Sequence, residues 1–247
     1  APEDQVTNVT LDGWLEGALS ILVNRGDIRV GVVRGMETSL QTRSGSVGAK
    51  LIEGNLRAHA GGGKVELEKV LGEHVEIRGD GVTCGALYAK TLLARVDREM
   101  HVAVLGVEDS RIALGDGAQA RLCALEGKVA LELCDTWDIE LQSSNRLRHL
   151  SVLRREQTSR SGEPAARSLA LSLPEDIRAV ADFGGQAQAS HVDPALEPRG
   201  DGRILGAQAP DAHECKLDFA QLGQATADIV IKRRSWLEQA LGKGLGT

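Results

Sequence analysis

The amino-acid sequence predicts an all-β fold, a parallel β-solenoid with coils of about 18 residues. First, segments that open on glycine recur at Gly26, Gly45, Gly63 and Gly81, with sequence intervals of 19, 18 and 18 (45 − 26, 63 − 45, 81 − 63), and a short fixed period is typical of a repeat architecture. Second, apolar residues alternate within each interval, which is the period of a strand. Third, the intervals leave no room for the crossover of about a dozen residues that a βαβ unit requires.

The period continues beyond the fourth glycine. Counting on from Gly81 in equal steps of 18 reaches Glu99, Gly117 and Asp135, where the segments EMHVAVLG, GAQARLCALEG and DTWDIELQ keep the same alternation. Aromatic residues make up only 2% of the chain, so the core must be built from Val, Ile, Leu and Ala, which suits a narrow solenoid interior. The 29 glycines fit a fold with a tight turn at every corner.

Composition excludes several classes of protein. The net charge of −6 argues against a general nucleic-acid binder, which needs a basic face. No run of about 18 apolar residues is present, so no transmembrane helix is predicted. The four cysteines lack CxxC spacing, which favours small buried side chains in a reducing compartment over disulfides or metal ligands: Cys84, Cys123, Cys134 and Cys215. The chain begins at Ala1 rather than methionine, as a processed mature terminus or a shortened chain would.

Residues 1–24 predict a first strand and a cap. Leu19, Ile21 and Val23 occupy alternate positions, as in a strand. An uncapped solenoid end exposes unpaired backbone and apolar surface, so we expect short capping elements at both ends. Trp14 is the side chain expected to cover the first end, and a position in the core is the alternative for it.

From residue 25 to 150 each coil is predicted to hold two short strands, one after the glycine and one before the next. The residues expected to face inward are Ile28, Val30, Leu40, Thr42, Val47, Leu56, Ala58, Val65, Leu67, Val75, Ile77, Ile112 and Leu114. Each strand should stack on its equivalent in the next coil, about 4.8 Å away.

Residues 146–167 interrupt the pattern and predict an arginine-rich insertion. We expect a strand to end near Leu153 and a solvated loop to follow. The alternative is a docking site for an acidic protein surface or for anionic lipid headgroups. The candidate partner-binding residues of that site are Arg146, Arg148, Arg154, Arg155 and Arg160.

The remainder is expected to complete one domain that spans residues 1–247. The segment SLALSLP at 168–174 alternates cleanly and predicts a strand, and CKLDFAQL and ADIVIKR predict two more. Residues 186–214 hold three of the six prolines and predict a long loop. Residues 235–247 predict a C-terminal cap, with Ser235 as the N-cap of a short closing helix.

Candidate catalytic and metal-binding residues are few. Asp80 and Asp116 each lie in a GDG turn, two coils and therefore about 10 Å apart, a distance that fits the carboxylates of an inverting glycosidase. Asp-Gly is also the ordinary choice for a tight turn. His59 and His74 could approach each other across one coil, but the histidine spacing does not predict a zinc site. The glycine-rich segment at 60–64 lacks the Ser/Thr of a phosphate-binding loop, so no cofactor is expected.

The segments GDIRV, SGSV, GGGKVEL and SLALSLP resemble the adhesin-type β-solenoid domain, a family of unknown function that is widespread in bacteria. Eukaryotic relatives end on a Ser-Trp-Leu tail similar to SWLEQAL here. The resemblance covers about residues 15–240. It implies a right-handed parallel β-solenoid and no established catalytic residues, and it implies a mitochondrial location for eukaryotic members.

The function that we expect is that of a non-enzymatic scaffold or accessory subunit in a larger mitochondrial protein assembly, since a solenoid offers long faces and two ends. The loops at 146–167 and 186–214 are the expected contact elements. One alternative is a carbohydrate-active enzyme that uses Asp80 and Asp116, although the few aromatic residues are scattered. Another is a surface adhesin, which the lack of a disulfide pattern disfavours.

Overall fold

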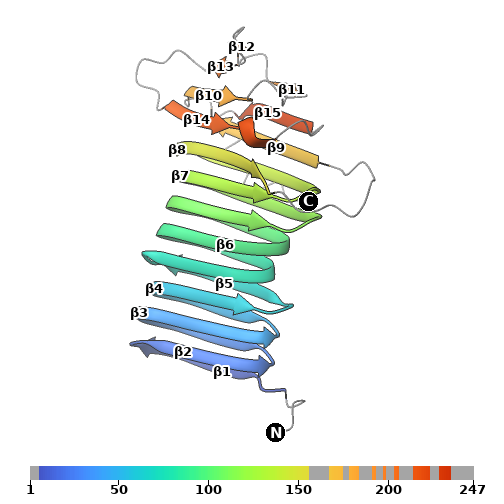
Figure 1. Cartoon of the computed structure of the whole chain (residues 1–247). Helices are drawn as coiled ribbons and strands as arrows, with labels where there is room; N and C mark the ends of the chain where they lie inside the picture. The colour runs from blue at the N-terminus through green and yellow to red at the C-terminus, as the bar shows by residue number, and fades with distance from the viewer. Residues whose placement is uncertain are drawn as a thin grey trace.

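The computed structural model describes residues 6–155, 167–174, 178–183, 191–192, 197–198, 203–205, 214–222 and 228–234. These residues form a solenoid of parallel strands that rises coil by coil from the N-terminal end (Figure 1). In chain order the elements are β1 (Val9–Glu16), β2 (Leu19–Arg25), β3 (Ile28–Ser44), β4 (Val47–Ala60), β5 (Lys64–Leu71), β6 (His74–Leu114), β7 (Ala118–Leu133), β8 (Trp137–Arg154), β9 (Arg167–Pro174), β10 (Arg178–Asp182), β11 (His191–Val192), β12 (Glu197–Pro198), β13 (Arg203–Leu205), β14 (Glu214–Asp218), the 3-10 helix η1 (Ala220–Leu222) and β15 (Asp228–Arg234). The prediction of a parallel β-solenoid is confirmed.

Successive coils pair in parallel with a register that varies slightly. Ile28 pairs with Val47, a sequence offset of 19 (47 − 28), and Val47 pairs with Val65, an offset of 18 (65 − 47). The offset falls to 17 where Lys64 pairs with Gly81 (81 − 64). It rises to 21 where Lys128 pairs with His149 (149 − 128). The predicted coil length is therefore correct on average. The coils whose offset differs from 18 determine which side chains become neighbours at the corners.

The strands are longer than predicted because they continue around the corners. β6 runs for 41 residues without a break, which is more than two coils. Its inward positions and those of the other coils are filled mainly by aliphatic side chains, which form one continuous core with Trp137, Phe183 and Phe219. All of the predicted inward residues are buried, including Thr42, whose hydroxyl donates a hydrogen bond to the carbonyl of Gly26 at 2.9 Å.

The last coil is assembled from segments that are distant in sequence. β9 pairs with β8 and with β15, so that Ser168 lies beside both Asp138 and Asp228. β14 pairs with β8 and with β10. The three predicted strands are present, but the 215–222 strand ends at Asp218 and continues as η1. Short strands β11, β12 and β13 occur inside the predicted 186–214 loop, and the remainder of that range up to Glu214 lies outside the described residues.

The start of the predicted arginine-rich insertion needs correction. The insertion does not begin at residue 146, because residues 146–154 continue β8 with Leu147, Leu150 and Val152 buried. The strand ends at Arg154, one residue beyond its expected end. Residues 156–166 and the predicted cap at 235–247 lie outside the described residues. Within the part of the chain that the structure describes, no helix is long and apolar enough to cross a membrane.

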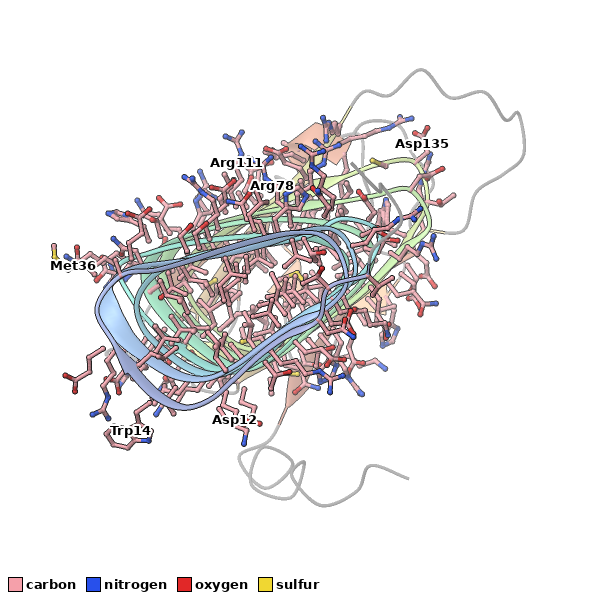
Figure 2. All side chains as sticks on the ribbon, turned by 90° about the horizontal axis from the view of Figure 1, so that it is seen from below. Asp12, Trp14, Met36, Arg78, Arg111 and Asp135 are labelled. Atoms are coloured by element: carbon pink, nitrogen blue, oxygen red, sulfur yellow. The ribbon has the colours of Figure 1, made fainter. Side chains whose placement is uncertain are left out.

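The prediction that Trp14 covers the N-terminal end is wrong. The side chain is 67% exposed and projects sideways from one long side of the solenoid (Figure 2). The guanidinium carbon of Arg34 lies 4.4 Å from the centroid of the Trp14 ring, a cation–π contact. The physical reason is strand alternation, because Leu15 packs toward the core and its neighbour must point outward.

Candidate functional site

A cavity lies at one corner of the coils, where β6, β7 and β8 stack on one another. Its volume is about 700 Å³, and it is open to solvent along one side. We call it the corner groove. It is lined by Gly106, Val107, Glu108, Glu126, Gly127, Asn145, Arg146, Leu147, Arg148 and Glu214. Two of the five candidate partner-binding arginines are therefore in one cavity with three carboxylates.

The corner groove exists because consecutive coils have different lengths at this corner. Leu125 pairs with Ser143, an offset of 18 (143 − 125), whereas Lys128 pairs with His149, an offset of 21 (149 − 128). The corner of β8 is therefore longer than the corner of β7 by the difference between these offsets (21 − 18). The extra residues of β8 cannot stack directly on the coil below. They protrude instead and form one wall of the corner groove. The strain of this irregular corner is visible at Ala124, whose φ of 48° lies in the left-handed region.

Hydrogen bonds fix the position of this wall. The Ser144 hydroxyl donates to the carbonyl of Leu125 at 3.0 Å and accepts the backbone N–H of Arg146 at 3.1 Å. Arg146 Nη1 then lies 3.8 Å from Glu126 Oε2, across the groove wall. Because the Arg146 side chain is 76% exposed and Glu126 is 27% exposed, the guanidinium stays largely available to solvent and to a ligand.

The charges of the corner groove have both signs. Among the described residues Arg148 forms no ion pair, and Glu108 and Glu214 form none at hydrogen-bonding distance. One coil closer to the N-terminus, Lys90 forms an ion pair with Glu73 at 2.5 Å. The hydrogen bond between them raises the pKa of Lys90 and lowers the pKa of Glu73, and the charge of Glu108 also contributes to the shift of Lys90. The corner thus presents charges of both signs along the solenoid axis.

Arg154 and Arg155 lie at the opposite narrow edge of the solenoid. Arg154 Nη2 binds Asp135 Oδ1 at 2.8 Å, and Arg167 donates from Nε to the Asp135 carbonyl at 2.6 Å. Asp135 therefore fastens both chain ends that flank residues 156–166, and we call this contact the Asp135 clamp. Figure 2 shows Asp135 at the narrow edge opposite Met36. Arg155 is exposed and its backbone N–H bonds to Leu133, while Arg160 lies outside the described residues.

Asp80 lies within β6 and Asp116 lies in the turn that follows it, on the two coils that flank Asp97 and Arg98. Arg98 lies 3.5 Å from Asp80. Asp116 accepts two hydrogen bonds from Thr136, from the hydroxyl at 2.5 Å and from the backbone N–H at 2.8 Å. The hydroxyl bond is the main reason that the pKa of Asp116 is lowered. Each carboxylate thus has a local partner that explains its presence without catalysis.

The histidine pair considered in the sequence does not form. His59 pairs in register with Gln41 and Arg78, whereas the backbone N–H of His74 bonds to the side chain of Asn55, at the other end of the strand. Coil lengths decide this outcome, since the local offset of 19 carries His59 to Arg78 (78 − 59). Within the described ranges, no group of three His, Cys, Asp or Glu side chains is placed to hold a metal ion.

The four cysteines form no disulfide with one another. Cys84, Cys134 and Cys215 are buried and Cys123 is half-buried. Burial raises the pKa of the Cys84 and Cys215 thiols to about 12, so these two side chains behave as small apolar core residues rather than as nucleophiles.

Sequence reasoning missed the carboxylates of the corner groove and the Asp135 clamp. Glu108 and Glu126 are one coil period apart in sequence, so the period alone could have placed them on neighbouring coils. Glu214 and Arg167 join their sites through pairings between distant segments, for which the sequence holds no periodic signal.

Comparison with models of known protein families, with curated proteins and with solved structures finds no match to this chain. The site is therefore interpreted from its own geometry.

Proposed function

We propose that this chain is a non-enzymatic interaction scaffold, an accessory subunit of a larger protein assembly, and that a partner polypeptide binds in the corner groove. Membership of the adhesin-type β-solenoid family and a mitochondrial location are parts of the same proposal. The observation that carries it is the juxtaposition of Arg146 and Arg148 with three carboxylates in an open cavity of about 700 Å³.

The chemistry of the corner groove favours a polypeptide over a small metabolite. An open cavity with charges of both signs matches an extended segment that carries acidic and basic side chains in turn. Acidic groups of the partner would contact Arg146 and Arg148, and basic groups would contact Glu108 and Glu214. Leu147 is buried at the base of the groove, so its contribution is to the fold rather than to the contact.

The solenoid supports this role by holding the corner groove at a fixed place. The coils on both sides are joined by continuous parallel pairing from β3 to β8, and the interior is one hydrophobic cluster. A solenoid of this type presents extended surfaces whose geometry changes little on binding. A partner bound at the corner groove is therefore at a set distance from anything bound at the N-terminal end.

The test is a double charge reversal, Arg146→Glu with Arg148→Glu. The matched control reverses Arg43 and Arg95, which are exposed arginines of β3 and β6. Both variants change the net charge equally, and exposed substitutions of this kind change stability by about 0.5 kcal/mol or less. Each is expressed in place of the endogenous chain, and a gentle mitochondrial extract is separated on a native gel.

We expect the wild type and the control variant to migrate in a large complex, and the groove variant to migrate near 26.3 kDa, the mass of one chain. Migration of the groove variant with the complex would refute the groove as the contact. Migration of the wild type itself near 26.3 kDa would refute the subunit role.

A further inference from the structure

The N-terminal coil of the solenoid is covered on one side only. Among the described residues β1 and β2 each pair only with β3, so the outer edge of both strands has no strand partner. Five inward side chains of this coil are only half-buried, and Val23 is the inward residue that is buried: the five are Val9, Leu11, Leu15, Leu19 and Ile21. Their equivalents one coil later are almost fully buried. One more layer of strands on β1 and β2 would complete the core at this end.

Large exposed apolar side chains are also most frequent in the first two coils. Six are exposed in the described part of the chain, and four of them belong to the first two coils: Val6 at 64%, Trp14 at 67%, Leu22 at 68% and Met36 at 88%. Figure 2, which views the molecule from the N-terminal end, shows Trp14 and Met36 projecting outside the ribbon. Of these four side chains, only Leu22 belongs to β2.

The two edge strands, β1 and β2, differ in how well they are protected from pairing with another strand. β1 carries a bulge at Asp12 and Gly13, where its register with β3 shifts, and it also carries the charge of Glu16. Bulges and charges are the features that protect an edge strand from pairing. β2 has neither feature between Leu19 and Asn24, because its register with β3 is unbroken and no residue in that range is charged. β2 is therefore the edge that remains available.

The sequence of β2 is self-complementary about Leu22. Its central residues read Ser-Ile-Leu-Val-Asn, with polar residues at both ends and β-branched residues on either side of leucine. In an antiparallel pair of two such strands, Leu22 lies opposite Leu22, and Ile21 lies opposite Val23 of the other copy. Ser20 then lies opposite Asn24. A two-fold axis through Leu22 requires this kind of self-matching surface.

We infer that two copies of this chain associate end to end, with β2 of one copy pairing antiparallel with β2 of the other about a two-fold axis at Leu22. The contact joins the two solenoids into one longer rod and brings the two exposed Leu22 side chains side by side as cross-strand neighbours. The same axis brings Arg25 of each copy to the corner where Glu16 of the other lies, so opposite charges meet at both ends of the contact. This inference goes beyond the proposed function, because it concerns the end of the solenoid and not the corner groove.

The first experiment measures the mass of the 247-residue chain by light scattering after size exclusion, over a concentration series. The expected mass is twice the 26.3 kDa of one chain. Leu22→Lys and Leu22→Glu each place like charges opposite each other at the axis, so each is expected to weaken the dimer at least about tenfold. The matched control is Leu93→Lys, the same change at an exposed strand position that is 48% exposed in β6, and it should leave the mass unchanged.

The second experiment mixes the two Leu22 variants. Lysine and glutamate then face each other, so the mixture should recover the dimer mass that neither variant shows alone. Recovery also proves that each variant is folded, which keeps a loss of mass from being mistaken for unfolding. A monomeric wild type would overturn the inference, as would dimers of Leu22→Lys at the wild-type concentration. A Leu93→Lys variant that is also monomeric, or a mixture that stays monomeric, would overturn the pairing of β2 with β2.

Discussion

Replacement of Gly54 by alanine tests whether the corners of this solenoid depend on glycine for space. Gly54 has a φ of 132°, and a Cβ built on it would lie 1.7 Å from the carbonyl oxygen of Gly35 in the preceding coil. The methyl group would point along the solenoid axis into backbone, which cannot move aside without separating two coils. The substitution therefore adds a steric clash to an unfavourable backbone conformation.

The expected loss follows from these two contributions. A non-glycine residue in a sparsely populated φ/ψ region costs about 1–3 kcal/mol. Overpacking of a close contact costs about 1–3 kcal/mol more. The two together amount to about 2–6 kcal/mol, and we expect a loss of about 4 kcal/mol in the free energy of unfolding, a large fraction of the stability of a domain of this size.

The matched control is Gly62→Ala in the same coil. Gly62 also has a positive φ, 69°, but a Cβ there would meet no atom within 4 Å. Only the backbone contribution remains, about 1–2 kcal/mol. Urea unfolding followed by circular dichroism gives both values, and hydrogen exchange of the flanking coils shows whether the coils unfold together, as two-state analysis requires. Equal losses for the two variants would refute the argument that close stacking of the corners demands glycine.

Two further predictions concern Asp135 and Asp116, the carboxylates that bind Arg154 and Thr136. Asp135→Asn weakens the contacts to Arg154 and Arg167, and it should lower the free energy of unfolding by about 1 kcal/mol because the clamp is partly exposed. Trypsin should also cut the variant between positions 155 and 167 faster than it cuts the wild type. An unchanged cleavage rate would contradict the clamp. The lowered pKa of Asp116 means that its bond to Thr136 stabilises the fold above the ordinary carboxyl pKa of 3.8 and that this stabilisation is lost as the pH falls through the folded-state value. The urea midpoint of Thr136→Val should thus fall below that of the wild type at neutral pH and converge with it in acid, and a difference that is independent of pH would contradict this account.

The fold could be predicted because apolar residues alternate with polar ones in short runs that recur at a fixed period. Ile28 and Val30, or Val75 and Ile77, are two positions apart in short runs, and glycine marks where one run ends. Burial of such pairs on a parallel sheet needs no information from distant segments. The glycine period then sets the coil length to within a few residues, which is sufficient to define the class of fold.

The candidate site could be predicted only in part, because it depends on the residues that break the period. The offset between coils changes from 18 to 21 at the corner of β8, and this change creates the corner groove around Arg146. A change of one or two residues in coil length decides which side chains become neighbours, as His59 and His74 show. No pattern in the sequence marked these changes in advance.

Distant pairing sets a second limit. The sequence identified Arg154 as a candidate contact residue, but its partner Asp135 belongs to the preceding coil, and Arg167 reaches the same carboxylate across the segment 156–166. The direction of Trp14, in contrast, could have been read from the sequence, because strand alternation beside the inward Leu15 requires it to point outward.

The direction of the backbone hydrogen bonds has a mechanical consequence. The strands run across the long axis of the solenoid, so the backbone hydrogen bonds between strands run along that axis. These hydrogen bonds connect the coils in series from β1 to β8. Tension applied between the two ends would load one ladder at a time and peel the coils away in turn, instead of shearing all of them together. Each released coil of about 19 residues would lengthen the chain by about 65 Å. A rod of this kind resists bending and compression, yet it extends under tension in equal steps and so limits the force that it transmits.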